Sequence, residues 1–214
     1  MATHSKFWPL AVIGIAASVG VLASLAWHRP AAPDLTTGSF LAPSRALPDF
    51  SLIDQRGKAY GSANLRGHWS LLFFGYTNCP DFCPTTLTTL AAMEKRLRAV
   101  AGQPVPQVLF VSVDAARDTP EQLAKYVPNF DPEFIGLTAP DQPGAEAFAK
   151  KLNVAVAIRP ISEGVYFVDH TGAIFVLNPD GRLSAVLTGP FTVDALQSDF
   201  QRIVAAGGVL AGRT

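Results

Sequence analysis

The segment between residues 69 and 113 constrains the fold of this chain more than any other. Residues 69–75 form a short apolar run of the length of a fully buried strand, and residues 108–113 form a second such run. Between the two runs, residues 85–100 place four apolar side chains at helical spacing, namely Leu87, Leu90, Met93 and Leu97. A strand, a helix and a strand in this order predict an α/β domain.

The chain beyond this unit continues the alternation of elements. Its patterns predict helices at 120–126 and 145–152, strands at 165–168, 173–177 and 183–187, and a closing helix at 192–206. Thr119 and Thr192 are the expected N-caps of two of these helices. The sequence Asn178-Pro179-Asp180-Gly181 is a strong turn signal that joins the last two strands as a hairpin. Together these patterns indicate a thioredoxin-like α/β sandwich.

An uncharged N-terminal run adds a second constraint. No charged residue occurs from Phe7 to Trp27, and these 21 residues exceed the roughly 18 to 20 that cross a membrane as a helix. The run predicts a transmembrane anchor. A cleaved signal peptide is the alternative, although its apolar region is usually only about 7 to 15 residues long. Either interpretation exports the rest of the chain.

The residues around this run suggest where the protein resides and how it is divided. The six residues before the run lack the Arg-rich character of a mitochondrial transit peptide, which favours a bacterial inner-membrane protein with its soluble domain in the periplasm. Pro30, Pro33 and Pro43 occur with little apolar periodicity, as in a flexible linker. We expect the chain from about Ser44 onward to fold without the anchor. The expected parts are an anchor at 1–28, a linker at 29–44 and a thioredoxin-like domain at 45–214.

Composition excludes two classes of protein. Lys and Arg number 17 against 17 for Asp and Glu, and no basic run occurs, so the chain lacks the charge pattern of a nucleic-acid binder. The chain has only two cysteines, Cys79 and Cys83, which rules out a scaffold held by several disulfides.

The two cysteines lie where a buried strand gives way to a helix. Pro80 and Pro84 each push the preceding cysteine away from helical backbone angles, so we expect both cysteines in a turn, with Cys83 near the helix N-terminus. The helix dipole there favours a thiolate, which is a nucleophile or a soft metal ligand. Their Cα atoms would lie roughly 6 Å apart, which also permits a disulfide. A structural disulfide, or two buried thiols, is the plainer alternative.

A histidine strengthens the metal interpretation. His170 stands at the start of the predicted hairpin strand, and by analogy the turn that enters this hairpin in thioredoxin-like sandwiches faces the cysteine loop. Two thiolates and an imidazole suit Cu(I), and also Zn²⁺ if a fourth ligand joins. The remaining histidines are interpreted as solvated residues: His4, His28 and His68.

Several motifs, taken in order, make the chain similar to the SCO/SenC family of membrane-tethered copper proteins. They are Pro48-Asp49-Phe50-Ser51-Leu52, the segment from Phe74 to Thr85 that holds both cysteines, Ser112-Val113-Asp114 with Arg117-Asp118-Thr119-Pro120, Phe134-Ile135-Gly136-Leu137-Thr138, and Val168-Asp169-His170. The resemblance implies that Cys79, Cys83 and His170 bind one copper ion. Asp114 matches an acidic position near the site of the family, and a strand-end capping residue is the alternative. Ala115 departs from the proline common in the family.

The resemblance also implies a function. It predicts a copper chaperone, not an enzyme, which assists assembly of the copper A centre in subunit II of cytochrome c oxidase. Cu(I) is the expected cargo, with Cu(II) left open, and other periplasmic copper chaperones or thiol–disulfide reductases are further expected partners. The alternatives are a thiol–disulfide oxidoreductase that keeps the oxidase cysteines reduced through a redox-active Cys79–Cys83 disulfide, a peroxide-reducing relative, and a copper or redox sensor. Three residues between the cysteines, instead of the usual two, favour metal binding.

Overall fold

The computed structural model describes residues 32–211. The predicted anchor at 1–28, with its uncharged run at 7–27, lies outside these residues, as do His4 and His28. Within residues 32–211, no helix is both long enough and apolar enough to cross a membrane.

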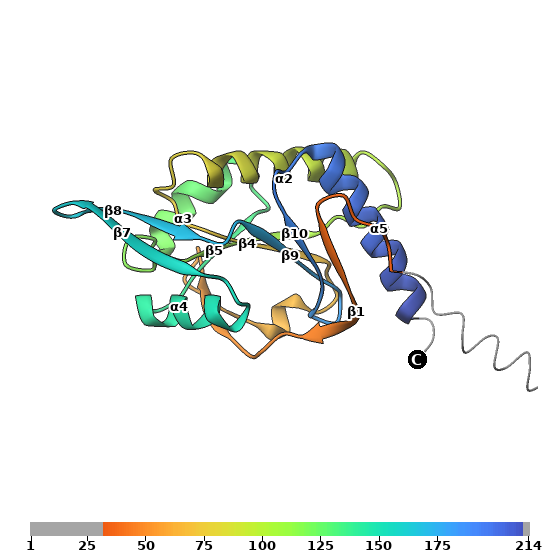
Figure 1. Cartoon of the computed structure of the whole chain (residues 1–214), viewed down its shortest axis with the longest axis horizontal. Helices are drawn as coiled ribbons and strands as arrows, with labels where there is room; N and C mark the ends of the chain where they lie inside the picture. The colour runs from red at the N-terminus through yellow and green to blue at the C-terminus, as the bar shows by residue number, and fades with distance from the viewer. Residues whose placement is uncertain (1–31, 212–214) are drawn as a thin grey trace, which may run out of the picture. The chain divides into compact units, whose positions relative to one another are not determined.

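An eight-stranded mixed sheet forms the centre of the domain, in the order β1-β10-β9-β4-β5-β6-β2-β3. Its strands are β1 (Gly38–Ala46), β2 (Ser51–Asp54), β3 (Ala59–Gly61), β4 (Ser70–Gly75), β5 (Gln107–Ser112), β6 (Ile135–Thr138), β9 (Ala173–Leu177) and β10 (Arg182–Thr188). β4, β5 and β6 run parallel, and β9 pairs antiparallel with β4. A separate two-stranded sheet consists of β7 (Val156–Ser162) and β8 (Val165–His170), which extends beyond the main sheet (Figure 1).

Helices cover both faces of the main sheet. Figure 1 shows α2 and α5 over one face and α4 over the other. The helices are α2 (Phe82–Arg98), α3 (Pro120–Tyr126), α4 (Gln142–Lys151) and α5 (Val193–Ala211), with short 3-10 turns η1 (Ser62–Leu65) and η2 (Val127–Asn129). This double cover explains why every residue of β4 and β9 is buried and why both read as continuous apolar runs. The predicted α/β sandwich is therefore confirmed.

The central strand–helix–strand unit agrees with the sequence prediction. The four apolar residues at helical spacing in α2 are all buried: Leu87, Leu90, Met93 and Leu97. Thr119 caps α3 by accepting the N–H of Gln122, and Thr192 accepts the N–H of Ala195 at the start of α5. The turn at 178–181 joins β9 to β10, as predicted.

The linker predicted at 29–44 is wrong in its second half. Residues 38–44 belong to β1, which pairs with β10 at the edge of the main sheet. Just before β1, the N–H groups of Thr36 and Thr37 donate to the fully buried carboxylate of Asp199 in α5, at 2.8 and 2.7 Å. The fold therefore includes Thr36, and a chain that starts at Ser44 lacks most of an edge strand. An edge strand tolerates Pro43 because one of its sides needs no ladder, which is why its composition resembled a linker.

Candidate metal centre

The cysteine loop begins where the buried strand β4 ends. Gly75 closes β4, and a Cβ at this position would lie 2.5 Å from the ring of Phe110 and 3.0 Å from the sulfur of Cys83. Real Cβ atoms do not approach other atoms so closely, so the backbone can run past Cys83 only with glycine here. The sulfur of Cys83 is thereby held against the main sheet.

Cys83 lies inside the first turn of α2, which corrects the expectation that it would sit in the preceding turn. The helix begins at Phe82, with Asp81 as its N-cap residue. First-turn N–H groups have no partner within the helix, so the missing N–H of Pro84 costs no helical hydrogen bond. Cys83 is fully buried, whereas Cys79 is partly exposed in the loop as predicted, and neither forms a disulfide.

The two sulfurs are coupled through hydrogen bonds. The backbone N–H of Cys83 donates to the sulfur of Cys79 at 3.3 Å. The thiol of Cys83 also donates to Cys79, which lowers the pKa of Cys79 to about 4, and His170 and backbone N–H groups act in the same direction against burial. The same thiol bond, together with burial, raises the pKa of Cys83. At neutral pH the pair therefore holds one proton, with the thiolate on Cys79.

His170 approaches the cysteines from a different element. It is the last residue of β8, and not the first residue of the following hairpin as the sequence suggested, because its partner strand β7 was not foreseen. Its Nε2 lies 3.6 Å from the sulfur of Cys83. The structure thus brings together the three residues singled out from the sequence.

Aromatic rings surround the imidazole of His170. The ring centroids of Phe73, Tyr76 and Phe82 lie 6.3, 6.2 and 6.3 Å from that of His170. A groove of about 390 Å³ opens beside them to solvent. Its lining includes Cys79, Phe82, Arg159, Phe167 and His170. A small ligand can therefore reach Cys79 and His170 from the solvent.

Two thiol groups and an imidazole have the chemistry that a soft metal ion prefers. Among the side chains that the structure describes, however, no group of three or more His, Cys, Asp or Glu residues is arranged so that it could hold a metal ion. The 3.6 Å between the Cys83 sulfur and His170 Nε2 does suit two ligands of one ion, because metal–sulfur and metal–nitrogen bonds are about 2.3 and 2.0 Å long. Cys79 is the remaining donor, and its sulfur accepts the N–H of Cys83.

Asp114 lies in a polar network beside these three residues. It is buried, its carboxylate accepts bonds from Arg117 and Tyr166, and its backbone N–H donates to the hydroxyl of Ser112. Its carbonyl also accepts the N–H groups of Arg117 and Asp118, so its contacts fit the alternative of a residue that caps the turn after the strand. Arg117 and Tyr166 were not identified from the sequence as site residues, because each meets Asp114 only in the folded chain. His68 is exposed, as expected.

Comparison with known proteins places this geometry in a family. A family model described as SCO1/SenC matches residues 41–205. The chain is 35% identical over 183 residues to a Stutzerimonas stutzeri protein named for copper binding, which covers 86% of this chain and 89% of that protein. It is 38% identical over 159 residues to the Bos taurus protein named SCO2 homolog, mitochondrial, which covers 74% of this chain and 59% of that protein. The chain thus spans less than two thirds of this mammalian relative.

Solved structures give the same result for the fold. Arabidopsis thaliana ScoI with copper bound superposes with a TM-score of 0.71 at 32% identity, over 75% of this chain and 99% of that chain. BsSco, described as a member of the Sco family of cytochrome c oxidase assembly proteins and studied for a disulfide switch, superposes with a TM-score of 0.59 at 27% identity, over 78% of this chain and 96% of that chain. The mixed α/β fold is therefore the thioredoxin-like fold of the Sco proteins.

Proposed function

The chain belongs to the SCO1/SenC family, and we propose that it is a copper chaperone that binds one copper ion through Cys79, Cys83 and His170. The observation that carries this proposal is the 3.6 Å approach of His170 Nε2 to the sulfur of Cys83, with Cys79 hydrogen-bonded to the N–H of Cys83. Thiolate and imidazole ligands select Cu(I) among common cellular metals, with Zn²⁺ the main competitor.

Loading requires two changes at the cysteines. The proton of Cys83 must leave, because only a thiolate is a strong ligand, and the sulfur of Cys79 must turn from the N–H of Cys83 toward the ion. His170 lies close to both sulfurs and supplies the third donor. The open groove beside Cys79 gives a partner protein access to the ion, so that a recipient can replace the ligands one at a time.

The destination of the copper is the finer part of the proposal. Relatives include a protein described as a member of a family of cytochrome c oxidase assembly proteins, which supports the copper A centre of oxidase subunit II as recipient. That centre is exposed on the periplasmic side in bacteria. The uncharged run at 7–27 supports a single membrane anchor with the domain in the periplasm.

Anaerobic titration of the reduced full-length protein in detergent tests the ligand set. We expect one Cu(I) per chain in competition with a chromophoric chelator, a clear loss of affinity in His170→Ala, and loss of stoichiometric binding in Cys79→Ser and Cys83→Ser. His68→Ala is the matched control, because His68 is exposed and outside the groove. Equal affinity in the wild type and His170→Ala would remove the histidine from the site.

A thiol–disulfide reductase is the second candidate function. It is supported by the low pKa of Cys79, since a thiolate at neutral pH can attack a disulfide, with Cys83 as the resolving thiol. Reduction of an oxidised copper A peptide by the metal-free protein would support it. Copper transfer without any change in the peptide's thiols would count against it.

A further inference from the structure

His170 is carried by an element that the main sheet does not hold. In the part of the chain that the structure describes, β8 pairs only with β7, in a sheet separate from the eight-stranded one. The backbone ladder therefore fixes His170 relative to β7 but not relative to the cysteine loop. The chain re-enters the main sheet at Ala173 in β9, three residues after His170, so this connection and side-chain contacts together set the distance between the two halves of the site.

The inner face of β8 shows where such contacts occur. Alternate residues of a strand share a face, so Tyr166, Val168 and His170 point the same way, and these are the residues of β8 that are buried or half-buried. Val168 is buried in the core. Tyr166 lies four residues before His170, about 13 Å along the strand. The contacts of Tyr166 therefore orient β8, the strand that ends at His170.

Tyr166 is held by an aspartate–arginine pair. Its hydroxyl donates to Asp114 Oδ1 at 2.8 Å, and its carbonyl accepts Nη1 of Arg117 at 3.2 Å. Arg117 Nε donates to the other carboxylate oxygen of Asp114 at 2.5 Å. The guanidinium also stacks 3.6 Å above the Tyr166 ring and lies 5.8 Å from the ring of Tyr76, which itself contacts His170. Only a planar fork makes all these contacts at once, so lysine is not equivalent here.

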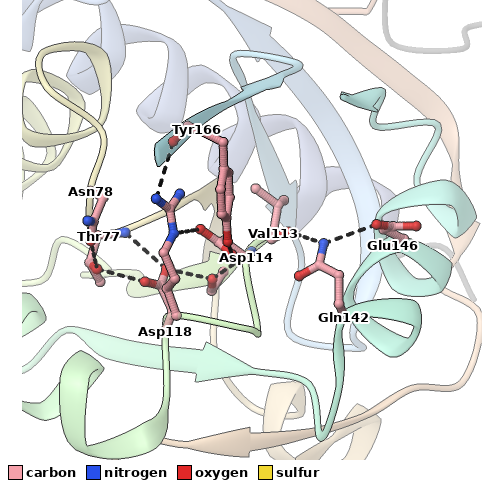
Figure 2. Close-up of polar contacts among 10 residues, drawn as sticks. Thr77, Asn78, Val113, Asp114, Asp118, Gln142, Glu146 and Tyr166 are labelled. Carbon is pink, nitrogen blue, oxygen red and sulfur yellow. Dashed lines mark hydrogen bonds and ion pairs between the residues drawn. The ribbon is translucent and has the colours of Figure 1, made fainter. Parts of the chain in front are cut away.

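A second buried carboxylate holds the cysteine loop from the same turn. Asp118 accepts the N–H of Thr77 at 2.9 Å and its hydroxyl at 2.6 Å, and Thr77 lies two residues before Cys79. The hydroxyl of Ser112 joins the two carboxylate residues, because it donates to Asp118 at 2.6 Å and accepts the N–H of Asp114 at 3.0 Å. Figure 2 shows Asp118 bonded toward Thr77 and Asp114 against Tyr166.

We propose that the turn at residues 112–118 is a bracket that sets the distance between the cysteine loop and His170. Asp118 is the positioning residue on the cysteine side, and Arg117 is the positioning residue on the histidine side. Neither touches the ligands' donor atoms. Both carboxylates of the bracket are buried, so an unpaired one would be costly and the contacts are held together as a set. The effect on copper rests on the proposed function, whereas the effect on the position of His170 does not.

The first test uses the full-length, metal-free protein and its histidine NMR signals. The three aromatic rings around His170 displace its ring-proton shifts from those of free histidine. Arg117→Met should move these shifts toward the free values, because the hairpin is released from the turn. Arg98→Met is the matched control, because Arg98 also pairs with buried carboxyl groups, those of Glu94 and Asp131, but at the far end of α2. It should leave the His170 signals in place.

The second test measures Cu(I) affinity of the same variants. Loss of a residue that orients a ligand weakens metal binding about 10- to 100-fold, so we expect a loss of Cu(I) affinity in this range for Arg117→Met. The affinity of Arg117→Lys should lie between those of Arg117→Met and the wild type. The affinity of Arg98→Met should equal that of the wild type. If Arg117→Met fails to fold, Tyr166→Phe serves instead, since it removes only the hydroxyl that reaches Asp114 and should give a smaller shift and loss.

The outcomes separate the two proposals. Unmoved His170 signals in a folded Arg117→Met or Tyr166→Phe variant would overturn the bracket, whatever the copper data show. Equal changes in Arg98→Met would also overturn it, because the effect would then reflect general stability. A wild type that binds no Cu(I), with His170 signals that still respond to Arg117→Met, would overturn the copper function and leave the bracket standing.

Discussion

The cysteine loop and the β7–β8 hairpin hold the two halves of one site, yet they are built in different ways. The cysteine loop leaves a strand whose residues are all buried, and Cys83, in the first turn of α2, is fully buried against the main sheet. The hairpin forms its own two-stranded sheet, and its side chains are mostly exposed. One half of the site is therefore part of the core, whereas the other is attached to it by a few contacts. Changes in the first half should reduce stability, and changes in the second should mainly alter binding.

A pair of glycine substitutions gives the largest expected contrast. Gly75→Ala places a Cβ 2.5 Å from Phe110 and 3.0 Å from Cys83, so we expect a loss of about 3 kcal/mol in the free energy of unfolding. Gly164→Ala, in the hairpin turn, meets no atom within 4 Å but has a φ of +72°, which costs only about 1 to 2 kcal/mol. Denaturant unfolding of both variants measures the difference. Equal losses would show that the core does not hold the cysteine loop more tightly than the hairpin.

Removal of the histidine should separate binding from stability. In His170→Ala we expect Cu(I) affinity to fall about 100-fold, at the upper end of the effects seen for residues that only orient a ligand. The free energy of unfolding should change by less than about 1 kcal/mol, because His170 is only half-buried at the end of the hairpin. Both thiols should still react with a thiol reagent after unfolding. A large loss of stability with unchanged affinity would reverse the roles of the two regions.

The two cysteines should differ in reactivity with pH. The pKa of Cys79 is lowered to about 4, so its thiolate is present from about pH 5 upward, whereas Cys83 is buried and stays a thiol. At pH 5 we expect Cys79 to be alkylated by iodoacetamide at least tenfold faster than a free cysteine, even after its lower intrinsic nucleophilicity is included. Mass spectrometry of the modified protein identifies the site. Preferential labelling of Cys83 would contradict the assignment of the proton.

The pKa shifts of the two cysteines also predict how the free energy of unfolding changes with pH. For Cys79, the unfolded chain binds a proton between about pH 4 and pH 9 that the folded chain does not, so this group adds stability as pH rises through that window. For Cys83 the folded chain keeps the proton above about pH 9, so stability should fall again there. The contribution of these two cysteines to the stability of the metal-free protein should therefore be greatest near the ordinary cysteine pKa, and Cys79→Ser should flatten the rise.

The smallest effect is expected at the surface of the hairpin. Arg159 and Asp169 form an ion pair whose side chains are 68% and 52% exposed. Exposed pairs contribute little, so Arg159→Gln should change the free energy of unfolding by less than about 0.5 kcal/mol. A larger loss, measured by denaturant unfolding, would mean that the hairpin is more firmly held than its exposure indicates.

The same contrast explains what the sequence could predict. The cysteine loop follows a continuous apolar strand and precedes a helix with regular spacing, and both signals are local. β7 has a single half-buried residue, Val156, and six exposed ones, so its side chains show no alternation for a sequence pattern to detect. The composition of β1 predicts a linker, because an edge strand can contain Pro43. The proximity of His170 to the cysteines was inferred by analogy with a fold, not from spacing.

The bracket between the two halves had no local signal either. Asp118 and Thr77 are 41 residues apart, and Tyr166 and Asp114 are 52 residues apart. Arg117 and Asp114 are three residues apart and form a pair that the sequence permits, but nothing near them shows that Tyr166 completes the network. Polar contacts of this kind depend on the finished fold, because each partner is brought to the turn by a different strand.

Because the fold already includes Thr36, a domain anchored to the membrane would have a shorter tether than the sequence predicts. In the anchored form that we propose, the segment between the anchor and the fold ends before Asp34, whose carbonyl accepts a bond from Arg202, and not at residue 44. A shorter tether raises the local concentration of the domain at the membrane. It also shortens the reach of the domain from the membrane. If the domain is anchored as proposed, the buried Asp199, which fixes Thr36 and Thr37 to α5, sets how far from the membrane the cysteine loop can reach.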